Sequence, residues 1–426
     1  MHSRDPNKNK AAFRQEILAI LNGVSERCFK DRHDFTWFIF PEANFYRATF
    51  TQKADFRGAT FTEEADFRSA TFTQKADFVG ATFTRDASFR GATFTQKAYF
   101  DLAKFTQTGV FSDATFAHDT YFAWVTFACG ADFSTATFSR RVGFYGTRFG
   151  LPHYGVATVA AGGGNPTPAI ANFMGAQFEQ PARVRFYQVN RGTSHGLRAH
   201  FVDCDISDIQ FVDVYWHQHE GRMALEDELV LYSEYRAQPE SDYELVATAY
   251  RQMVNNFEKA RNYGLAEDCY IGAMEMKRLD PAEPPTSRII VTVYRWLSGY
   301  GSSYTRALGM LSGFLLAFAL LFPVFGLRMT DPQEAERVQC PVAAPGSPES
   351  SVISWGCAMA HAEVGREAWG SFKAGLLAAA ETATFQRRPT LEPANNWGRA
   401  VAMTEVVVIP GQLALLFLAL RRRFRR

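Results

Sequence analysis

The sequence lacks the features that mark several large classes of protein. Only six cysteines occur in 426 residues, which excludes a small scaffold built on disulfides. No excess of one charge is present either, because 45 Lys and Arg residues balance 44 Asp and Glu residues, for a net charge of +1. This balance argues against nucleic acid as a partner held by bulk electrostatics.

Motifs of catalytic and metal centres are equally scarce. The segment His217-Gln218-His219-Glu220 offers two ligand-type side chains, but no third ligand follows at a recognisable spacing, so we interpret it as a polar surface turn. The Gly-rich stretch at 150–170 lacks the Lys-Ser/Thr of a phosphate loop and is interpreted as a flexible loop. We therefore expect no enzyme activity, no metal and no cofactor.

Phenylalanine, in contrast, is abundant and regularly spaced. Of 39 phenylalanines, 20 lie in one register from Phe45 to Phe149, in steps that alternate between five and six residues. Ala stands two residues before 15 of these 20. A helix with this 11-residue period is excluded, because Thr, Asp, Ser, Gly and Phe are poor helix formers. A solenoid that stacks one large and one small side chain inward fits the pattern.

The repeat resembles the pentapeptide-repeat family, whose motif A-[DN]-[LF]-x-x appears in Ala54-Asp55-Phe56 and Ala76-Asp77-Phe78. The resemblance implies a right-handed, four-sided β-helix with inward phenylalanines. The additional residue in alternate units implies a wider corner. One coil of four sides would take 22 residues, and a two-sided coil of 11 residues is the alternative. Some relatives mimic DNA with an acidic surface, but residues 45–149 hold 10 acidic and 12 basic residues. This mixed charge favours structural support or docking of a cytoplasmic protein or ligand.

Composition divides the chain into four parts. Residues 1–34 form an N-terminal helix or cap, and residues 35–216 the β-helix, interrupted by the 150–170 loop and ending near Trp216. Residues 217–286 form a helical connector, in which an apolar stripe at three- and four-residue steps predicts a buried face. Its members are Leu245, Ala249, Met253, Phe257 and Ala260. Residues 287–426 form an all-α, two-span membrane domain.

Two apolar stretches, Ala307–Leu327 and Ala400–Leu420, are long enough to cross the hydrocarbon layer. Trp, Tyr and Arg before the first stretch are typical of a membrane interface. Five arginines among the last six residues predict a cytoplasmic C-terminus, and two spans then place the N-terminus there too. In the outer loop, Cys340 and Cys357 form a disulfide or stay two free thiols.

The segment between the spans resembles the pore loop of two-transmembrane bacterial potassium channels. Glu381-Thr382-Ala383-Thr384 is similar to the end of their pore helix, and Trp397-Gly398-Arg399 matches the start of their inner helix. The resemblance implies an outer helix, a re-entrant pore helix (here 369–385), a filter and an inner helix, assembled four-fold. The filter differs, because T-V-G-Y-G is replaced by Phe385-Gln386-Arg387-Arg388-Pro389. Without those glycines the carbonyl stack that selects potassium cannot form. The predicted pore and filter residues are Thr382, Ala383, Thr384, Phe385, Gln386, Arg387 and Arg388.

Polar residues in the second span supply further predictions. Glu405 and Gln412 are seven residues apart and share a helix face, which predicts either a polar pore lining or hydrogen bonds between helices. Pro410 and Gly411 predict a gating hinge or a packing kink. Together these patterns favour a homotetrameric ion channel of the bacterial inner membrane that contacts lipid and the permeating ion but not nucleic acid. The alternative is a non-conducting, membrane-anchored scaffold for protein partners.

Overall fold

The computed structural model describes residues 9–21, 28–29, 32–150, 169–191, 193, 195–232, 242–325, 327–329, 352–353, 364–383, 391–393 and 395–424. The chain divides into two compact units, residues 1–284 and 285–426. Each unit is described by itself below.

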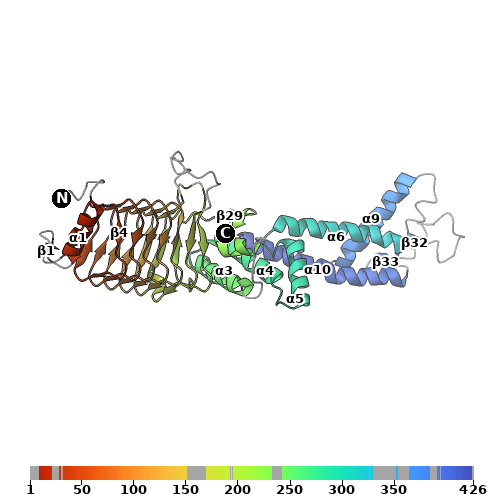
Figure 1. The fold of residues 1–426 in the computed structure, drawn as a ribbon. Helices are drawn as coiled ribbons and strands as arrows, with labels where there is room; N and C mark the ends of the chain where they lie inside the picture. The colour runs from red at the N-terminus through yellow and green to blue at the C-terminus, as the bar shows by residue number, and fades with distance from the viewer. Residues whose placement is uncertain are drawn as a thin grey trace, which may run out of the picture. The chain divides into compact units, whose positions relative to one another are not determined.

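Short strands in the first unit stack as a β-solenoid (Figure 1), which confirms that the repeat folds as a solenoid. Two sheets contain the Ala-Asp-type segments. One comprises β1 (Cys28–Phe29), β2 (Arg32–Asp34), β6 (Lys53–Asp55), β10 (Ala76–Asp77), β14 (Ala98–Tyr99), β18 (Thr120–Tyr121), β22 (Val142–Tyr145), β26 (Val184–Tyr187) and β28 (Gln210–Val212). The other comprises β4 (Ala43–Asn44), β8 (Ala65–Asp66), β12 (Ala87–Ser88), β16 (Gly109–Val110), β20 (Gly130–Asp132), β24 (Ile170–Asn172) and β27 (Arg198–His200).

The remaining two sheets contain the Thr-Phe segments. One comprises β3 (Ile39–Phe40), β7 (Thr60–Phe61), β11 (Thr82–Phe83), β15 (Lys104–Phe105), β19 (Thr126–Phe127) and β23 (Arg148–Phe149). The other comprises β5 (Thr49–Phe50), β9 (Thr71–Phe72), β13 (Thr93–Phe94), β17 (Thr115–Phe116), β21 (Thr137–Phe138) and β25 (Gln177–Phe178). Except for β1, which pairs with β2 antiparallel, the strands pair in parallel with the strand one coil away, as Ala76 does with Ala54 and Ala98. The register of 22 residues excludes the two-sided coil of 11.

The core consists of phenylalanine rings in columns along the solenoid. Phe78 stacks on Phe56 at 4.8 Å and on Phe100 at 5.0 Å, with interplanar angles of 3° and 1°. Phe89 of a neighbouring column meets Phe78 edge-on at 5.3 Å, so offset stacks and edge contacts alternate through the core. The residue two positions before a ring is buried as well: it is Ala in most coils, as at Ala54, Ala76 and Ala98, and Val at Val125 and Val142.

Two kinds of corner explain the alternation of five- and six-residue steps. In the five-residue step the Ala59 N–H donates to the Phe56 carbonyl at 3.0 Å, and Gly58 has a φ of +64°, as a tight turn of this type requires. In the six-residue step the additional residue widens the corner, and the Thr62 hydroxyl donates to the Phe40 carbonyl of the preceding coil at 3.1 Å. The Thr that follows Phe61, Phe72, Phe83, Phe94 or Phe105 donates in the same way, so these threonines tie successive coils together.

Both ends of the solenoid core are covered. At the start, α1 (Lys10–Leu21) places Phe13 against Phe40, with ring centroids 5.5 Å apart. Near the other end the sheet of β23 stops, and the buried Asn190 side chain takes the place of a further strand by accepting from the Phe149 N–H at 2.7 Å and donating to its carbonyl at 3.0 Å. Trp216 then packs on the last ring column, at 5.3 Å from Phe211.

The helical connector follows this end. The 3-10 helix η1 (Pro181–Arg183) lies within the solenoid, between β25 and β26. The connector begins with the hairpin of β29 (Gln218–His219) and β30 (Arg222–Met223), and its helices are α2 (Glu226–Tyr232), α3 (Asp242–Lys259) and α4 (Tyr263–Leu279). The predicted stripe on α3 is partly wrong, because Leu245 is 39% exposed and Ala260 lies beyond the helix. Val246 and Tyr250 are buried instead, since α3 turns its Val246–Tyr250–Met253 face toward the solenoid end and α4.

The second unit contains four helices among its described residues. They are α5 (Pro285–Ser298), α6 (Tyr304–Phe325), α9 (Val364–Ala383) and α10 (Asn396–Phe424). Three short strands form an antiparallel sheet in which β31 (Leu327–Met329) lies between β32 (Val352–Ile353) and β33 (Leu391–Pro393). Helix α10 contains the second predicted apolar stretch, whereas α6 ends at Phe325, and Leu327, the last residue of the first stretch, lies in β31. Both helices are long and apolar enough to cross a membrane.

Candidate functional site in the C-terminal unit

The second unit has an apolar core shared by its three longest helices. Leu311, Phe318 and Phe322 of α6 pack with Ala378 and Ala379 of α9, and Ile409 of α10 joins the same cluster. The helix between the two apolar helices is thus an integral part of their packing. Sequence reasoning predicted a helix in this place, at residues 369–385.

Helix α9 approaches α6 closely at one glycine. A Cβ atom added at Gly375 would lie 2.0 Å from the Ala319 carbonyl oxygen and 2.9 Å from its carbon. No side chain fits there, so the backbones of α9 and α6 are in direct contact at this point. Small residues at such crossings are the usual means by which helices pack in lipid.

The end of α9 is held by Glu381. Its side chain is buried, and its Oε2 accepts from the Leu391 N–H of β33 at the long distance of 3.4 Å. This contact joins the two sides of the segment that resembles a pore loop. Of the predicted filter residues, Thr382 and Ala383 are the last two of α9, whereas Thr384, Phe385, Gln386, Arg387 and Arg388 lie outside the described residues, as do Cys340 and Cys357.

Glu405 and Gln412 lie on the side of α10 that faces the chain's own helices. They are 0% and 2% exposed. The Gln412 Nε2 donates to the Ala307 carbonyl at 2.8 Å and to the Leu297 carbonyl at 3.3 Å, so it makes the interhelical hydrogen bonds that were one of its two predicted roles. Neither Glu405 carboxylate oxygen has a hydrogen-bond partner among the described residues. For either side chain to line a pore between chains, α10 would have to turn, and the pore-lining role stays a prediction.

The predicted hinge lies inside one continuous helix. Pro410 is an interior residue of α10, which runs on to Phe424. A Cβ atom at Gly411 would meet no atom of the described residues within 4 Å, so their packing does not explain this glycine. The gating role of both residues stays a prediction.

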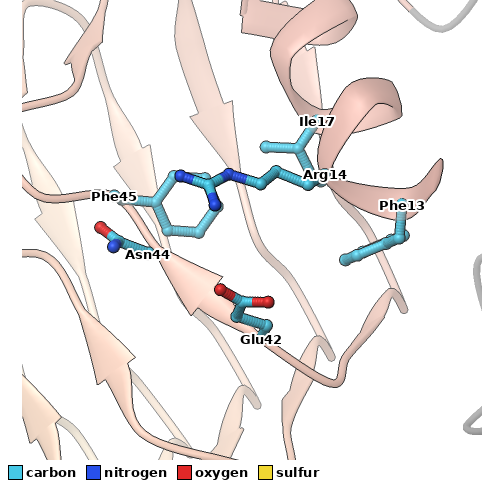
Figure 2. Close-up of a pocket in the computed structure, with 6 residues that line it drawn as sticks. All are labelled: Phe13, Arg14, Ile17, Glu42, Asn44 and Phe45. Carbon is cyan, nitrogen blue, oxygen red and sulfur yellow. The ribbon is translucent and has the colours of Figure 1, made fainter. Parts of the chain in front are cut away.

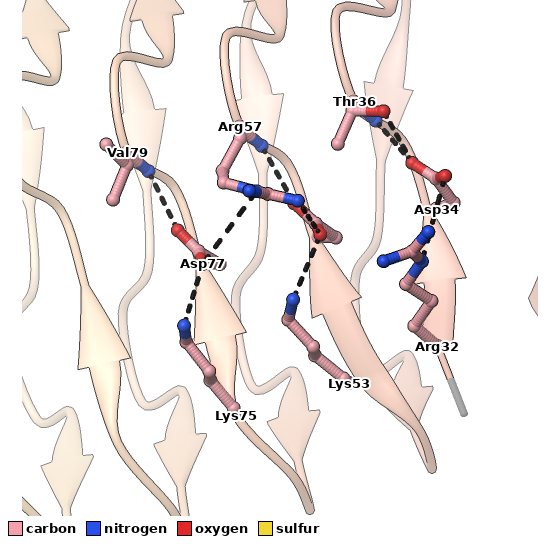
Figure 3. Close-up of polar contacts among 9 residues, drawn as sticks. Arg32, Asp34, Thr36, Lys53, Arg57, Lys75, Asp77 and Val79 are labelled. Carbon is pink, nitrogen blue, oxygen red and sulfur yellow. Dashed lines mark hydrogen bonds and ion pairs between the residues drawn. The ribbon is translucent and has the colours of Figure 1, made fainter.

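The solenoid carries a ladder of paired charges that sequence reasoning did not identify (Figure 3). The buried Asp55 carboxylate receives two hydrogen bonds from Arg57, each at 2.7 Å, and one from Lys53 at 3.1 Å, and Lys75 lies 2.9 Å from Asp77 one coil on. Burial raises the pKa of Asp55, but the hydrogen bonds from Arg57 and Lys53 together lower it more, so its pKa falls below the usual value. The ladder neutralises buried charge on one face.

A second charged network joins the solenoid end to the connector. Three consecutive buried acids begin α2. Glu226 binds Arg198 of β27 through both carboxylate oxygens, and Asp227 accepts from the Phe201 N–H at 2.8 Å. Glu228 is paired with the Arg222 guanidinium and accepts from the Tyr250 hydroxyl. All three carboxylates have hydrogen-bond partners within the unit, so we assign this network a structural role.

The metal-ligand side chains and the pocket of the first unit do not form a ligand site among the described residues. In the described ranges, no group of three or more His, Cys, Asp or Glu residues is arranged to hold a metal ion. A pocket between α1 and β4 of the first coil is lined by Phe13, Arg14, Ile17, Glu42, Asn44 and Phe45 (Figure 2). Its volume of about 20 Å³ has room for roughly one water molecule.

Comparison with known proteins gives one match. Residues 45–93 and 78–126 match the family model for pentapeptide repeats (9 copies). No curated protein and no solved structure matches the chain. The matched residues are the Phe-stacked coils described above, and two helices long enough to span a membrane follow them. The chain therefore contains a pentapeptide-repeat domain, folded as a β-solenoid.

Proposed function

We propose that the chain is a membrane-anchored repeat protein whose second unit is the pore-loop domain of a homotetrameric ion channel. In this proposal α6 is the outer helix, α9 the re-entrant pore helix and α10 the inner helix, and the pentapeptide-repeat domain gates or organises the channel from the cytoplasm. The membrane is the bacterial inner membrane. For the solenoid we propose the right-handed, four-sided winding, which the four sheets support.

The observation that carries the proposal is the packing of α9. A helix that only connected two spans outside the membrane would not need backbone contact with one of them, yet Gly375 lies directly against Ala319 of α6. Moreover, α9 shares an apolar core with both α6 and α10. A helix that is inserted between two spans and held by both is the arrangement of a pore loop, in which non-spanning backbone is buried in protein.

The outer surfaces of the unit favour assembly. Met403, Val407 and Phe417 lie on one face of α10 and are each more than two-thirds exposed in a single chain. They recur at intervals of four and ten residues, so they form a stripe along the helix. In a tetramer this stripe would face neighbouring subunits and the central axis, and lipid would cover the exposed leucines of α6.

The arginines at the predicted filter define the selectivity that we propose. Arg387 and Arg388 replace positions at which potassium channels present backbone carbonyls, so four subunits would bring up to eight positive charges together. Such a ring attracts anions and repels cations. The permeating ion is thus proposed to be an anion.

A second candidate is a non-conducting scaffold that docks a protein on the solenoid. The orientation of Glu405 and Gln412 favours it, because the two polar side chains expected in the pore face inward within one chain. The same membrane anchor would then only localise the pentapeptide-repeat domain.

Oligomeric state and current, measured on the same sample, distinguish the two candidates. We expect native mass spectrometry of the detergent-purified chain to give a tetramer and planar-bilayer recordings to give currents. A tetramer or smaller species that carries no current under any ionic condition would favour the scaffold. Reporters fused at Arg426 and near Asp5 should both read cytoplasmic, and a reporter on the opposite side would refute the two-span topology.

A further inference from the structure

We propose that α5, together with arginines that the fold gathers beside it, forms a binding surface for the headgroups of anionic phospholipids. This inference rests on the proposed membrane anchoring of the second unit, and it is independent of whether the unit conducts ions. The occupant is a lipid surface, which the following three observations identify.

First, α5 exposes an apolar face that no described residue of its own unit covers. Ile290 and Trp296 are 68% and 64% exposed, and Ile289 and Val293 lie on the same side of the helix. The opposite side packs inward, where Val291 and Ser298 are buried. A helix of 14 residues is too short to span a membrane. A helix with one exposed apolar face and polar flanks lies in the interface between headgroups and acyl chains.

Second, the fold fixes α5 at the end of the unit where that interface must be. The turn after α5 is tied to the C-terminal part of α10, because Arg422 Nη1 donates to the Tyr300 carbonyl at 2.8 Å. Gln412 binds the Leu297 carbonyl, and Gly301 lies close to Leu418. Helix α6 begins and α10 ends at this level. Since both helices are proposed to cross the membrane, their common end marks a membrane surface.

Third, this end of the unit carries charge of one sign only. Its described arginines are Arg288, Arg295, Arg306, Arg421 and Arg422, and no Asp or Glu occurs in residues 285–325 or after Glu405. Arg288 and Arg295 are seven residues apart and share one flank of α5. Arg306 Nη1 donates to the Arg295 carbonyl at 3.3 Å, which brings the first turn of α6 to the same place.

The position of Arg306 also favours the binding of an anion. It lies in the first turn of α6, where the positive end of the helix dipole disfavours a cation. A phosphate beside it would be attracted by the guanidinium groups and by the helix end together. The phosphate available at this depth, next to an apolar helix face, is that of a lipid headgroup, and a net negative lipid adds attraction for each arginine.

Lipid binding to the whole protein tests the proposal. The full-length chain, purified in a zwitterionic detergent, is titrated with phosphatidylglycerol or with phosphatidylcholine of the same acyl chains, and bound lipid is counted by native mass spectrometry. We expect wild-type protein to bind phosphatidylglycerol more tightly. In the double variant Arg288→Gln, Arg295→Gln the Kd for phosphatidylglycerol should rise about five-fold per arginine, while the Kd for phosphatidylcholine stays the same.

Controls separate this site from charge elsewhere and from free phosphate. Arg140→Gln with Arg141→Gln removes two exposed charges from the solenoid and should leave both affinities unchanged. Ile290→Asn with Trp296→Asn should weaken the binding of both lipids, because the apolar face would no longer insert. Inorganic phosphate at millimolar concentration should not displace phosphatidylglycerol.

Three results would overturn the inference. They are equal affinity of the wild type for the two lipids, an unchanged preference in the Arg288→Gln, Arg295→Gln variant with normal circular dichroism, and full displacement by inorganic phosphate. Protection of the Ile290 and Trp296 face by a co-purified protein instead of lipid would also contradict it. Failure of the membrane anchoring itself is recognised separately, because alkaline carbonate would then release the wild-type chain from membranes without detergent.

Discussion

Removing one ring from the middle of the phenylalanine core should destabilise the solenoid strongly and locally. Phe78 is fully buried and stacks on Phe56 and Phe100, with further edge contacts to Phe67 and Phe89. The substitution Phe78→Ala deletes all of these contacts and leaves a cavity that the rigid coils above and below cannot close.

The magnitude follows from cavity-forming substitutions. Phe→Ala variants lose both the burial of the ring and its packing contacts, which together cost about 3–5 kcal/mol. For a folded unit of this size, each kcal/mol lowers Tm by about 2–4 °C, so the expected decrease is roughly 6–20 °C. Phe78→Asp should cost more, because it also buries a charge without a partner, and the affected coils should unfold.

Thermal circular dichroism of the full-length chain measures the overall effect, and hydrogen exchange locates it. Each coil contacts only its neighbours in a solenoid, so amide protection should be lost first in β6, β10 and β14. Tyr215→Ala removes an aromatic side chain that is 51% exposed and should change the free energy of unfolding by less than about 0.5 kcal/mol. A Phe78→Asp variant that melts like the wild type would refute the inward-facing phenylalanine columns.

Three further predictions follow from the corners, the sheet end and the charge pairs. Gly80→Ala should lower the free energy of unfolding by about 1 kcal/mol through its positive φ alone, whereas Gly58→Ala should lower it more, because its Cβ would meet the Trp37 ring at 2.5 Å. Denaturant unfolding with and without Trp37→Ala separates the two causes. Equal losses of stability for Gly80→Ala and Gly58→Ala would contradict the proposed clash. Asn190→Ala should cost about 1–3 kcal/mol, since the Phe149 N–H and carbonyl lose their partners, and a neutral result would refute the strand-like role of this side chain. The hydrogen bond from Arg68 holds the pKa of Asp66 below its usual value. This pair therefore stabilises the fold above about pH 4, and the stabilisation is lost as the pH falls through the lowered pKa. Asp66→Asn should remove that part of the pH dependence of Tm, and an unchanged dependence of Tm on acidic pH would refute the role of the pair.

The solenoid was predictable because every coil repeats the same physical requirement. One Phe and one small residue must enter the core per side, so the period, the inward residues and the stacking all follow from the positions of Phe and Ala. The sequence indicated the tight corner only through the shorter, five-residue step between phenylalanines. That Trp37 and Leu102 adopt the same positive φ as Gly58 could not be predicted from side-chain preference, because the flanking hydrogen bonds of each coil impose it.

Non-repeating contacts were much less predictable. The network of Glu228, Arg222 and Tyr250 joins residues from β30, α2 and α3, and no spacing in the sequence identifies such partners. For the same reason the stripe on α3 was predicted one residue out of place at Leu245, since the position of the helix against the solenoid end decides which face is buried.

In the second unit the sequence predicted the elements better than their orientations. Hydropathy and length were sufficient for α6 and α10, because both properties are local. The direction in which Gln412 points depends instead on the carbonyl groups of Leu297 and Ala307, more than 100 residues away in the chain. Helical periodicity placed Glu405 and Gln412 on one face but could not say what that face meets.

Reversal potentials of a filter variant test the proposed channel most directly. If Arg387 and Arg388 ring the pore, they favour anions, because a unit charge about 4 Å from an ion contributes about 4 kcal/mol at an effective dielectric constant of about 20. In planar bilayers with a salt gradient, Arg387→Gln with Arg388→Gln should shift the reversal potential toward that of the cation. Arg140→Gln with Arg141→Gln, two exposed residues of the solenoid, serves as a control with the same loss of charge outside the filter. An unchanged reversal potential in the filter variant, with current intact, would contradict the proposed pore, and so would the absence of current from intact wild-type tetramers.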